Sequence, residues 1–154
     1  INKNIIDNDS EKTLSMLDYN VHIKGKSMFN TPPVFSVLMC NLTLKWIKAQ
    51  GGLGKVEEIN NKKAQLLYDE IERNSLFNCL VAKKDRSIMN VCFDAVNEKV
   101  EIDFLNYSLE NNILGIKGHK LKGGFRASLY NTMPIENVQQ LVNCMISFEK
   151  NFNH

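Results

Sequence analysis

Apolar residues recur at every third or fourth position in four stretches of the chain, and this spacing predicts four helices. The first is expected to open at Thr31-Pro32-Pro33, because threonine is an adequate N-cap and proline is tolerated in a first turn. It is expected to end at Gly51-Gly52, since glycine commonly follows the last turn of a helix. The other three are predicted over residues 55–73, over residues 98–111 and from Pro134 onward.

Each predicted helix carries an apolar stripe, which is typical of a helix that packs on a core. In the first helix the apolar residues at helical spacing are Phe35, Leu38, Met39, Leu42 and Trp46. In the other three, the residues expected to face inward are Val56, Ile59, Leu66, Leu67, Ile71, Val100, Phe104, Tyr107, Val138, Leu141, Val142, Met145 and Phe148.

Alternation of apolar and polar residues predicts strands between these helices. Residues 89–95 alternate well, with Val91 and Phe93 on one face and Cys92 and Asp94 on the other. Shorter strand candidates are residues 77–81, 113–116 and 125–130. Ahead of all these elements, residues 1–15 are expected to hold the end of a core element and a polar loop, and residues 16–31 an irregular connecting segment.

The predicted order is helix, helix, strand, strand, helix, strand, strand, helix, without internal repeats. Strands that follow one another in hairpins, mixed with helices, favour an α+β fold. We expect a small antiparallel or mixed sheet covered on one face by helices. The two long helices nearer the N-terminus either pack against that layer or lead in from another domain.

Composition supports a folded domain and narrows the class of partner. The chain has 154 residues, enough for one ordinary domain, with 44% hydrophobic and 23% charged residues. A formal net charge of +2 does not call for a nucleic acid or a membrane surface as partner. The sequence contains no apolar run of membrane-spanning length and no signal peptide. The first residue is Ile1 rather than methionine, which suggests a fragment or a processed form.

The cysteines do not suggest a metal site or a disulfide framework. Cys40, Cys79, Cys92 and Cys144 are scattered, each in an apolar stretch, with no CxxC pair and no histidine at metal-ligand spacing. We therefore expect buried, reduced thiols, as in a reducing cytosol, and no metal.

The strongest chemical signal is the cationic, glycine-rich segment over residues 117–128. It holds Lys117, His119, Lys120 and Lys122, then two glycines, then Arg126. Glycine lets backbone approach a ligand, and an arginine can bind a carboxylate through two parallel hydrogen bonds. A small dianion would suit such a segment. The alternative is an ordinary solvated turn between strands, with Arg126 paired to a carboxylate of the protein.

A second candidate lies at the start of the first helix, at Asn30 and Thr31. Thr31 can act simply as a cap. Asparagine and threonine side chains at a helix N-terminus can also bind an anion such as a phosphate, and the two roles are compatible. No serine–histidine–aspartate pattern, Walker motif or dinucleotide fingerprint is present.

Several segments, taken in order along the chain, resemble the phosphoserine aminotransferase family. They are Ser27-Met-Phe-Asn-Thr-Pro-Pro33, Lys45-Trp-Ile-Lys-Ala-Gln-Gly-Gly52, Asp85-Arg-Ser-Ile-Met-Asn-Val91, Lys117-Gly-His119, Gly123-Gly-Phe-Arg-Ala-Ser-Leu-Tyr-Asn131 and Met133-Pro134. Each segment is weak alone, but the ordered set is specific and covers residues 13–149.

The resemblance implies a pyridoxal-phosphate (PLP) enzyme of the aspartate-aminotransferase fold type that works as a homodimer. The family exchanges an amino group between glutamate and 3-phosphohydroxypyruvate, giving phosphoserine and 2-oxoglutarate in serine biosynthesis. Many bacterial members also act in pyridoxine biosynthesis. The resemblance therefore implies small-molecule substrates, a cytoplasmic location, and neither nucleic acid nor membrane as partner.

Site residues follow from the same resemblance. Arg126 matches the arginine that binds the substrate α-carboxylate, and His119 a histidine that holds the distal anion. Lys120 stands where the family commonly has arginine, so it keeps the charge without the planar fork. Asn30 and Thr31 match the pair that reaches the cofactor phosphate of the neighbouring subunit. His22, Arg86 and Asn90 also match family positions. His22 is expected to be structural, and no ligand is assigned to Arg86 or Asn90.

The match covers only the C-terminal part of the family, whose members are more than twice as long. The lysine that binds the cofactor covalently lies, in the family, upstream of Ile1, so no catalytic residue is expected on this chain and the chain alone is expected to be inactive. Residues 1–30 are expected to end the cofactor domain and link onward, and residues 31–154 to form the small C-terminal domain with its leading helices. The competing hypothesis is a non-catalytic α+β regulatory module that binds a small anion.

Overall fold

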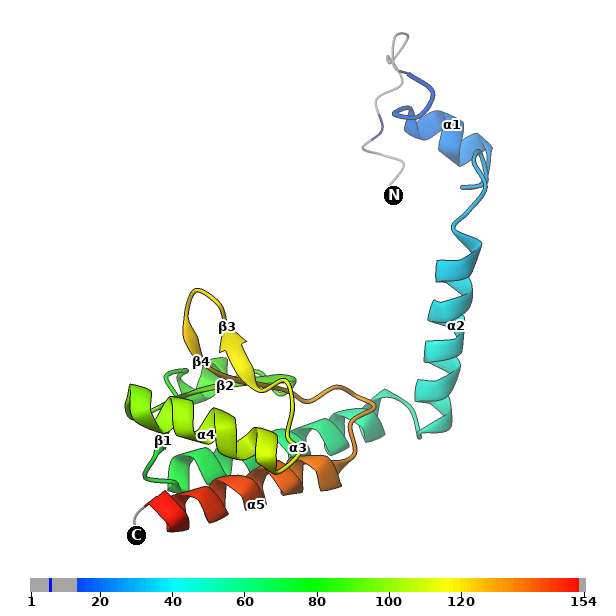
Figure 1. The fold of residues 1–154 in the computed structure, drawn as a ribbon. Helices are drawn as coiled ribbons and strands as arrows, with labels where there is room; N and C mark the ends of the chain where they lie inside the picture. The colour runs from blue at the N-terminus through cyan, green and yellow to red at the C-terminus, as the bar shows by residue number, and fades with distance from the viewer. Residues whose placement is uncertain (1–5, 7–13, 153–154) are drawn as a thin grey trace. The chain divides into compact units, whose positions relative to one another are not determined.

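The computed structural model describes residue 6 and residues 14–152. Its elements in chain order are α1 (Tyr19–Lys24), α2 (Val34–Ala49), α3 (Leu53–Arg73), β1 (Phe77–Asn78), the 3-10 helix η2 (Lys83–Asp85), β2 (Asn90–Ala95), α4 (Glu98–Glu110), β3 (Lys117–His119), β4 (Gly123–Ser128) and α5 (Ile135–Phe152) (Figure 1). Contacts divide the chain into two compact units, residues 1–46 and residues 47–154, which are described separately.

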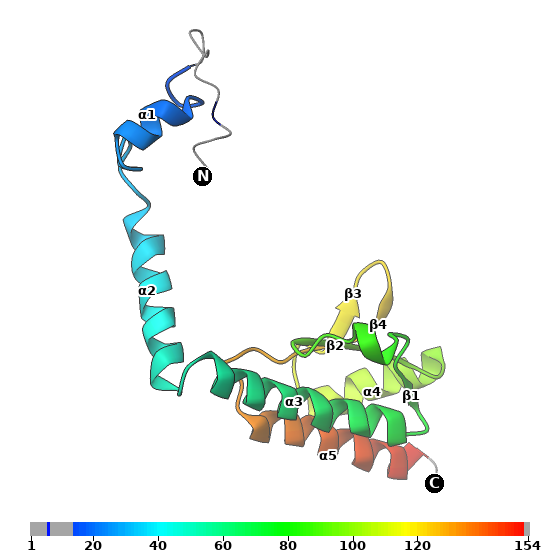
Figure 2. The same ribbon diagram turned by 180° about the vertical axis from the view of Figure 1, so that it is seen from behind.

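The second unit is an antiparallel sheet with helices on one face, which confirms the α+β prediction. The strands lie in the order β1-β2-β4-β3, and all three pairings are antiparallel. Helices α3, α4 and α5 lie on the same side of the sheet, with α3 and α5 side by side (Figures 1 and 2). From α2 to α5 the predicted order of long helices and strands is also confirmed, with η2 as an addition.

Aromatic rings fill the space between the sheet and the helices. The Phe77 ring of β1 lies 5.6 Å from the Phe93 ring, 4.8 Å from the Phe104 ring and 5.8 Å from the Phe125 ring, all edge-on. Edge-on pairs at these separations add to the gain from burying apolar surface. Strand β2 alternates as the pattern predicted, so that Val91 and Phe93 point into this core. Strand β4 also alternates, and Phe125 and Ala127 point into the same core.

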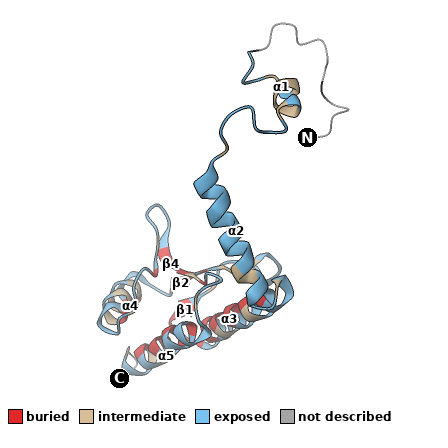
Figure 3. Cartoon of the chain, turned by 90° about the vertical axis from the view of Figure 1, so that its right-hand side faces the viewer, coloured by how far each residue is buried: buried red, intermediate tan, exposed pale blue. Residues whose placement is uncertain are grey.

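The inward faces predicted for the helices are largely confirmed. Val56, Leu67, Ile71, Val100, Phe104, Val138, Leu141, Val142, Met145 and Phe148 are buried, whereas Ile59, Leu66 and Tyr107 are half-buried. Figure 3 shows this burial concentrated on the faces of α3 and α5 that meet the sheet. The pattern missed the buried polar residues of α3, namely Asn60, Lys63 and Glu70.

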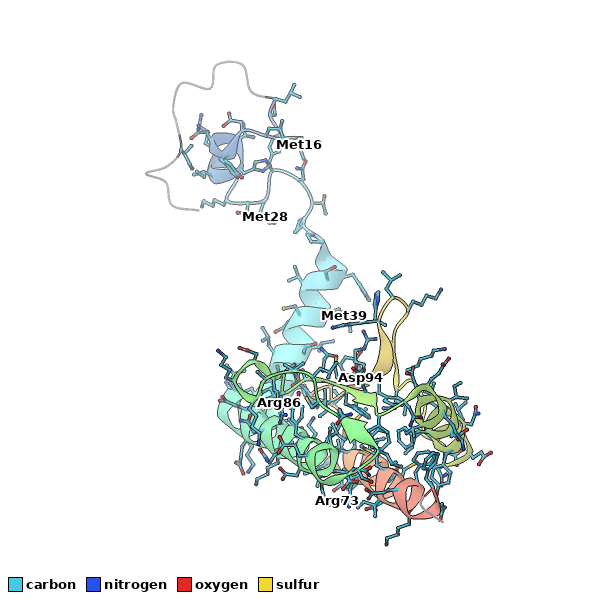
Figure 4. The ribbon with its side chains drawn as sticks, turned by 90° about the vertical axis from the view of Figure 1, so that its left-hand side faces the viewer. Met16, Met28, Met39, Arg73, Arg86 and Asp94 are labelled. Atoms are coloured by element: carbon cyan, nitrogen blue, oxygen red, sulfur yellow. The ribbon has the colours of Figure 1, made fainter. Side chains whose placement is uncertain are left out.

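A polar network joins the C-terminal end of α3 to α5. Arg73, which is labelled in Figure 4, donates two hydrogen bonds of 2.8 Å to the Glu70 carboxylate and one of 2.7 Å to Glu149. Glu149 also accepts from the backbone N–H and the hydroxyl of Ser75. Hydrogen bonds to the ionised carboxylate hold the pKa of Glu149 below its usual value, against the opposing effect of burial. The network fixes the turn that leads from α3 into β1.

Three of the four predicted strands differ from the structure by more than one residue. β1 is limited to Phe77–Asn78, the predicted strand over residues 113–116 is wrong, and β4 is Gly123–Ser128 instead of residues 125–130. The strand that pairs with β4 is β3, Lys117–His119, which lies inside the segment that was expected to be a turn. Short strands with polar residues and glycines carry little apolar alternation, so the pattern had no signal there.

The first unit contains α1 and most of α2. α1 lies in the segment predicted to be irregular, and the Asp18 side chain caps it by accepting from the Asn20 N–H at 2.8 Å. α1 has six residues and buries none, so it has no apolar stripe to detect. Most of residues 1–15, including the predicted core element, lies outside the described residues.

α2 begins at Val34, so Thr31 is not its N-cap, and that prediction is wrong. The first N–H of the helix donates instead to the Pro32 carbonyl at 2.8 Å. α2 has no buried residue in the structure, and most of its apolar side chains are exposed, whereas Trp46 and Ile47 are half-buried (Figure 3).

The cysteine prediction holds only in part. All four thiols are free, but Cys144 alone is buried, Cys79 is half-buried, and Cys40 and Cys92 are exposed. Cys40 lies on the uncovered α2, and Cys92 alternates to the outer face of β2.

Candidate functional site

The candidate site lies on the face of the sheet that the helices leave uncovered. Cys92 on β2 is the register partner of Arg126 on β4, and Asn90 is the partner of Ser128. Directly opposite residues of an antiparallel pair project to the same face, so Cys92 and Arg126 are neighbours there. The Ser128 hydroxyl donates to Asn90 Oδ1 at 3.1 Å, which fixes that end of the face.

The cationic segment forms a hairpin in which β3 and β4 pair, joined by a tight turn. The Lys122 N–H donates to the His119 carbonyl at 2.9 Å, and His119 is the register partner of Gly123. The Leu121 N–H donates to His119 Nδ1 at 3.3 Å. Because Nδ1 accepts, Nε2 is the ring nitrogen that carries a proton in the neutral imidazole and can donate to a ligand.

The glycines allow the hairpin to pack against the protein itself. A Cβ on Gly118 would overlap the Gly123 carbonyl oxygen, and a Cβ on Gly124 would overlap Asp94 Oδ1. Gly123 and Gly124 also have φ angles of +72° and +64°, which disfavour other residues. The expectation that these glycines let backbone approach a ligand is replaced by close approach within the hairpin and to β2.

His119 and Arg126 line one cavity of about 200 Å³, together with Lys122. The remaining lining residues are Leu80, Val81, Cys92, Phe93, Asp94, Gly118, Gly123 and Phe125. Of the predicted binding residues in this unit, the structure thus brings His119 and Arg126 together, whereas Lys120 is not in the lining. Lys122 was noted as part of the cationic run but was not predicted as a site residue. The i, i+3 turn from His119 to Lys122 is the signal that could have found it.

Arg126 is exposed and forms no salt bridge within the described part of the chain. The alternative that it serves a structural ion pair is therefore not supported among those residues. Its backbone is held firmly, because its N–H donates to the Ile116 carbonyl at 2.8 Å and β4 pairs with β2. A guanidinium on a fixed strand, unpaired and beside a cavity, can bind a carboxylate or phosphate in two-point fashion.

Arg86, in contrast, is fully engaged in the fold. Its guanidinium lies 4.7 Å from the centre of the Tyr68 ring, donates to the Val81 carbonyl at 3.2 Å and pairs with Glu72. Hydrogen bonds from Arg86 and Lys83 lower the pKa of Glu72. This cluster anchors the segment between β1 and β2 onto α3.

Asn30 and Thr31 lie in the first unit, both exposed, shortly before α2. The Asn30 amide donates to Met16 Sδ at 3.2 Å, a weak acceptor, so a phosphate could displace that contact. Amide and hydroxyl donors near the positive end of a 16-residue helix fit the chemistry of a phosphate group. His22, expected to be structural, contacts the Met16 carbonyl at 3.1 Å and lies edge-on to Phe29.

The described residues contain no cluster of three or more histidine, cysteine or acidic side chains that could hold a metal ion. In the same part of the chain, no helix combines the length and apolarity needed to cross a membrane.

The second unit thus carries an arginine and a cationic hairpin on the open face of an antiparallel sheet. Comparison with known proteins shows which family has this sequence and fold. A sequence model for aminotransferase class-V matches residues 10–141. The chain therefore belongs to the class-V aminotransferase family. Its relatives within that family are phosphoserine aminotransferases, as the sequence resemblance indicated.

The similarity extends over nearly all of this chain but a smaller part of each relative. Phosphoserine aminotransferase of Bacteroides fragilis is 51% identical over 138 residues, which cover 88% of this chain and 39% of that protein. The Azobacteroides pseudotrichonymphae enzyme is 46% identical over 152 residues, 97% of this chain and 42% of that protein. The chain thus spans about two fifths of the length of the curated relatives it matches.

Solved structures similar to this chain are also phosphoserine aminotransferases. Phosphoserine aminotransferase from Bacillus circulans subsp. alkalophilus superimposes with a TM-score of 0.80 at 39% identity, over 90% of this chain and 39% of that one. The PLP-bound enzyme from Trichomonas vaginalis gives a TM-score of 0.75 at 34% identity, over 88% of this chain and 39% of that one.

Proposed function

We propose that this chain is the C-terminal part of a phosphoserine aminotransferase, which moves an amino group between glutamate and 3-phosphohydroxypyruvate in serine biosynthesis. The observation that carries the proposal is the meeting of His119, Lys122 and Arg126 at one cavity on the open face of the sheet. Similarity to phosphoserine aminotransferases over nearly the whole chain supports it. Every substrate in this reaction carries two anionic ends, and the cavity offers a cation for each.

In this proposal Arg126 binds the α-carboxylate shared by all the substrates. The planar guanidinium of an arginine matches the geometry of a carboxylate. His119 binds the distal phosphate or carboxylate through Nε2, with Lys122 at the same cavity and Lys120 supplying charge from the hairpin turn. A substrate without the distal anion would leave the two lysines and the Nε2–H donor of His119 without a partner, and this difference is the physical basis for selecting substrates with two anionic ends.

Pyridoxal phosphate is the cofactor of the proposed parent enzyme, and it supplies an electron sink for the reacting carbon when bound. From this chain, Asn30 and Thr31 would donate hydrogen bonds to the cofactor phosphate. By analogy with the family, we propose that the cofactor phosphate they bind belongs to the neighbouring subunit of a homodimer. The proposal includes a cytoplasmic enzyme with small-molecule substrates. In it, residues 1–30 end the cofactor domain and link onward, and residues 31–154 form the small C-terminal domain with its leading helices.

The role of Arg126 is tested by Arg126→Ala in the full-length parent loaded with pyridoxal phosphate. Losing a two-point charged contact should lower kcat/KM for phosphoserine by about a hundredfold or more, while the absorbance of the bound cofactor stays. Arg126→Lys should recover only part of the loss, because lysine keeps the charge without the fork.

The matched control is Lys84→Ala, which removes one positive charge from an exposed position on η2. It should leave the kinetics unchanged. Turnover that is unaffected by Arg126→Ala would remove Arg126 from the site.

A further inference from the structure

Glu101, on the first turn of α4, reaches the hairpin that carries His119. Its Oε1 accepts a hydrogen bond of 3.1 Å from the Gly124 N–H. A Cβ on Gly123 would lie 3.6 Å from the same oxygen, so the carboxylate lies against both glycines. These are the residues at which the chain leaves the hairpin turn with positive φ angles.

This contact is important because few side-chain hydrogen bonds connect the hairpin to the rest of the domain. Among the described residues, Glu101 provides the one side-chain hydrogen bond from outside to residues 117–124. Beyond the base, the hairpin projects from the sheet, and Leu121 at its turn is 92% exposed (Figure 1). A short two-stranded hairpin is marginally stable by itself in water, so its base determines how well its tip is ordered.

Asp94, on β2, also lies against Gly124. Its carboxylate packs where a side chain of residue 124 would begin, and Asp94 lies by the base of the hairpin in Figure 4. Gly124 is thus confined between a side chain of α4 and a side chain of β2. A carboxylate at the base also offsets the mutual repulsion of the cationic groups that the hairpin carries close together.

We infer that Glu101 is a positioning residue for substrate recognition, an inference that rests on the proposed function. By holding the Gly124 N–H, Glu101 fixes the hairpin so that His119 and Lys122 face the same cavity as Arg126. Without this contact the hairpin samples more orientations, and ordering it on substrate binding costs affinity for the distal anion.

Glu101 also lies in the first turn of α4, where an acidic residue interacts favourably with the helix dipole. A substitution could therefore lower stability without any effect on recognition, and the experiment must separate the two. Three variants of the full-length parent loaded with pyridoxal phosphate do so: Glu101→Ala, Glu101→Gln and Glu98→Ala. Glutamine keeps an acceptor oxygen at residue 101, and Glu98→Ala removes the same charge from another position in the first turn of α4.

Glu101→Ala should raise KM for phosphoserine about tenfold, as expected for a lost hydrogen bond to a charged group, with kcat changed less than about twofold. Glu101→Gln should stay within about threefold of the wild type, and Glu98→Ala should match the wild type. An unchanged KM with a lowered melting temperature would overturn the inference, as would a Glu101→Gln variant impaired as strongly as Glu101→Ala.

Amide hydrogen exchange over residues 117–126 provides a readout that does not depend on turnover. Glu101→Ala should accelerate exchange there while leaving α3 and α5 unchanged, and Glu101→Gln should not. A parent that never acts on phosphoserine, but shows this exchange pattern, would contradict the proposed function and leave the positioning contact standing. Equal exchange in all variants would overturn the positioning contact itself.

Discussion

Lys63 lies on α3 with no exposed surface, and its ammonium group donates to the carbonyl oxygens of Tyr130 at 2.7 Å and Met133 at 3.2 Å. No carboxylate pairs with it among the described residues. Burial accordingly lowers the pKa of Lys63 from its ordinary 10.5. The two carbonyls belong to the connection between β4 and α5, so one buried side chain fixes the segment that follows Arg126 along the chain.

Lys63→Met keeps most of the side-chain volume but removes the buried ammonium group. It should lower the free energy of unfolding by about 1–3 kcal/mol at pH 7, because the two carbonyls lose their buried donor. Urea unfolding of the chain measures this directly. Lys62→Met, on an exposed position of the same helix, is the control and should change stability little.

The effect of Lys63→Met on the free energy of unfolding should depend on pH, because the pKa of Lys63 differs between the folded and unfolded states. The folded state has the lower pKa for Lys63, so in the window below 10.5 the unfolded state binds more protons. The contribution of Lys63 to stability should therefore increase as pH rises through that window and level off above it. The stability difference between wild type and Lys63→Met should grow between pH 7 and pH 10. A difference that shrinks over this range would contradict the assignment.

At the scale of elements, the hairpin depends on glycines for steric reasons more than for flexibility. Gly118 has no room for a Cβ beside the Gly123 carbonyl. Gly118→Ala should therefore force β3 away from β4 and weaken substrate binding by the parent about tenfold or more, through displacement of His119. KM for phosphoserine and hydrogen exchange in the hairpin measure the two effects.

Gly54 provides the matched control, because it lies in the first turn of α3 and a Cβ there would meet nothing within 4 Å. Gly54→Ala should leave KM unchanged and raise stability by about 0.5–1 kcal/mol, since alanine is the better helix former. Equal kinetics for Gly118→Ala and Gly54→Ala would show that the hairpin geometry does not matter for binding.

The sequence pattern could predict the long elements and could not predict the hairpin. α3 and α5 have apolar residues at helical spacing that end up buried, as in Leu67 and Met145, so their existence and inner faces followed from periodicity. β3 has three residues, Lys117, Gly118 and His119, none of them apolar, and its pairing depends on the glycine contacts. Such a strand is specified by its partner, and periodicity contains no information about it.

The same distinction applies to the site. Arg126 and His119 could be selected from the sequence because their residue types and the family resemblance coincide. Lys122 and Glu101 could not, because their positions at the cavity and at Gly124 depend on the turn geometry and on how α4 lies along the sheet. Lys63 was missed because a lysine on a helix is normally exposed.

For the whole molecule, we propose that this chain supplies the anion-recognition part of a phosphoserine aminotransferase and needs the rest of the parent for activity. The second unit has its own core, formed by helices packed on an antiparallel sheet. α2, in contrast, exposes apolar side chains such as Phe35 and Leu44, which is unusual for a helix that functions uncovered. We therefore expect the 154-residue chain and the parent to behave differently.

The most direct measurement is formation of phosphoserine from glutamate and 3-phosphohydroxypyruvate by the parent loaded with pyridoxal phosphate, beside calorimetric titration of phosphoserine into the isolated chain. We predict turnover by the parent, with a strong preference for the phosphorylated keto acid over pyruvate, and no micromolar binding by the isolated chain. A parent without this preference would contradict the account. Micromolar binding of phosphoserine by the isolated chain would do so as well, and would favour a small-anion-binding regulatory module.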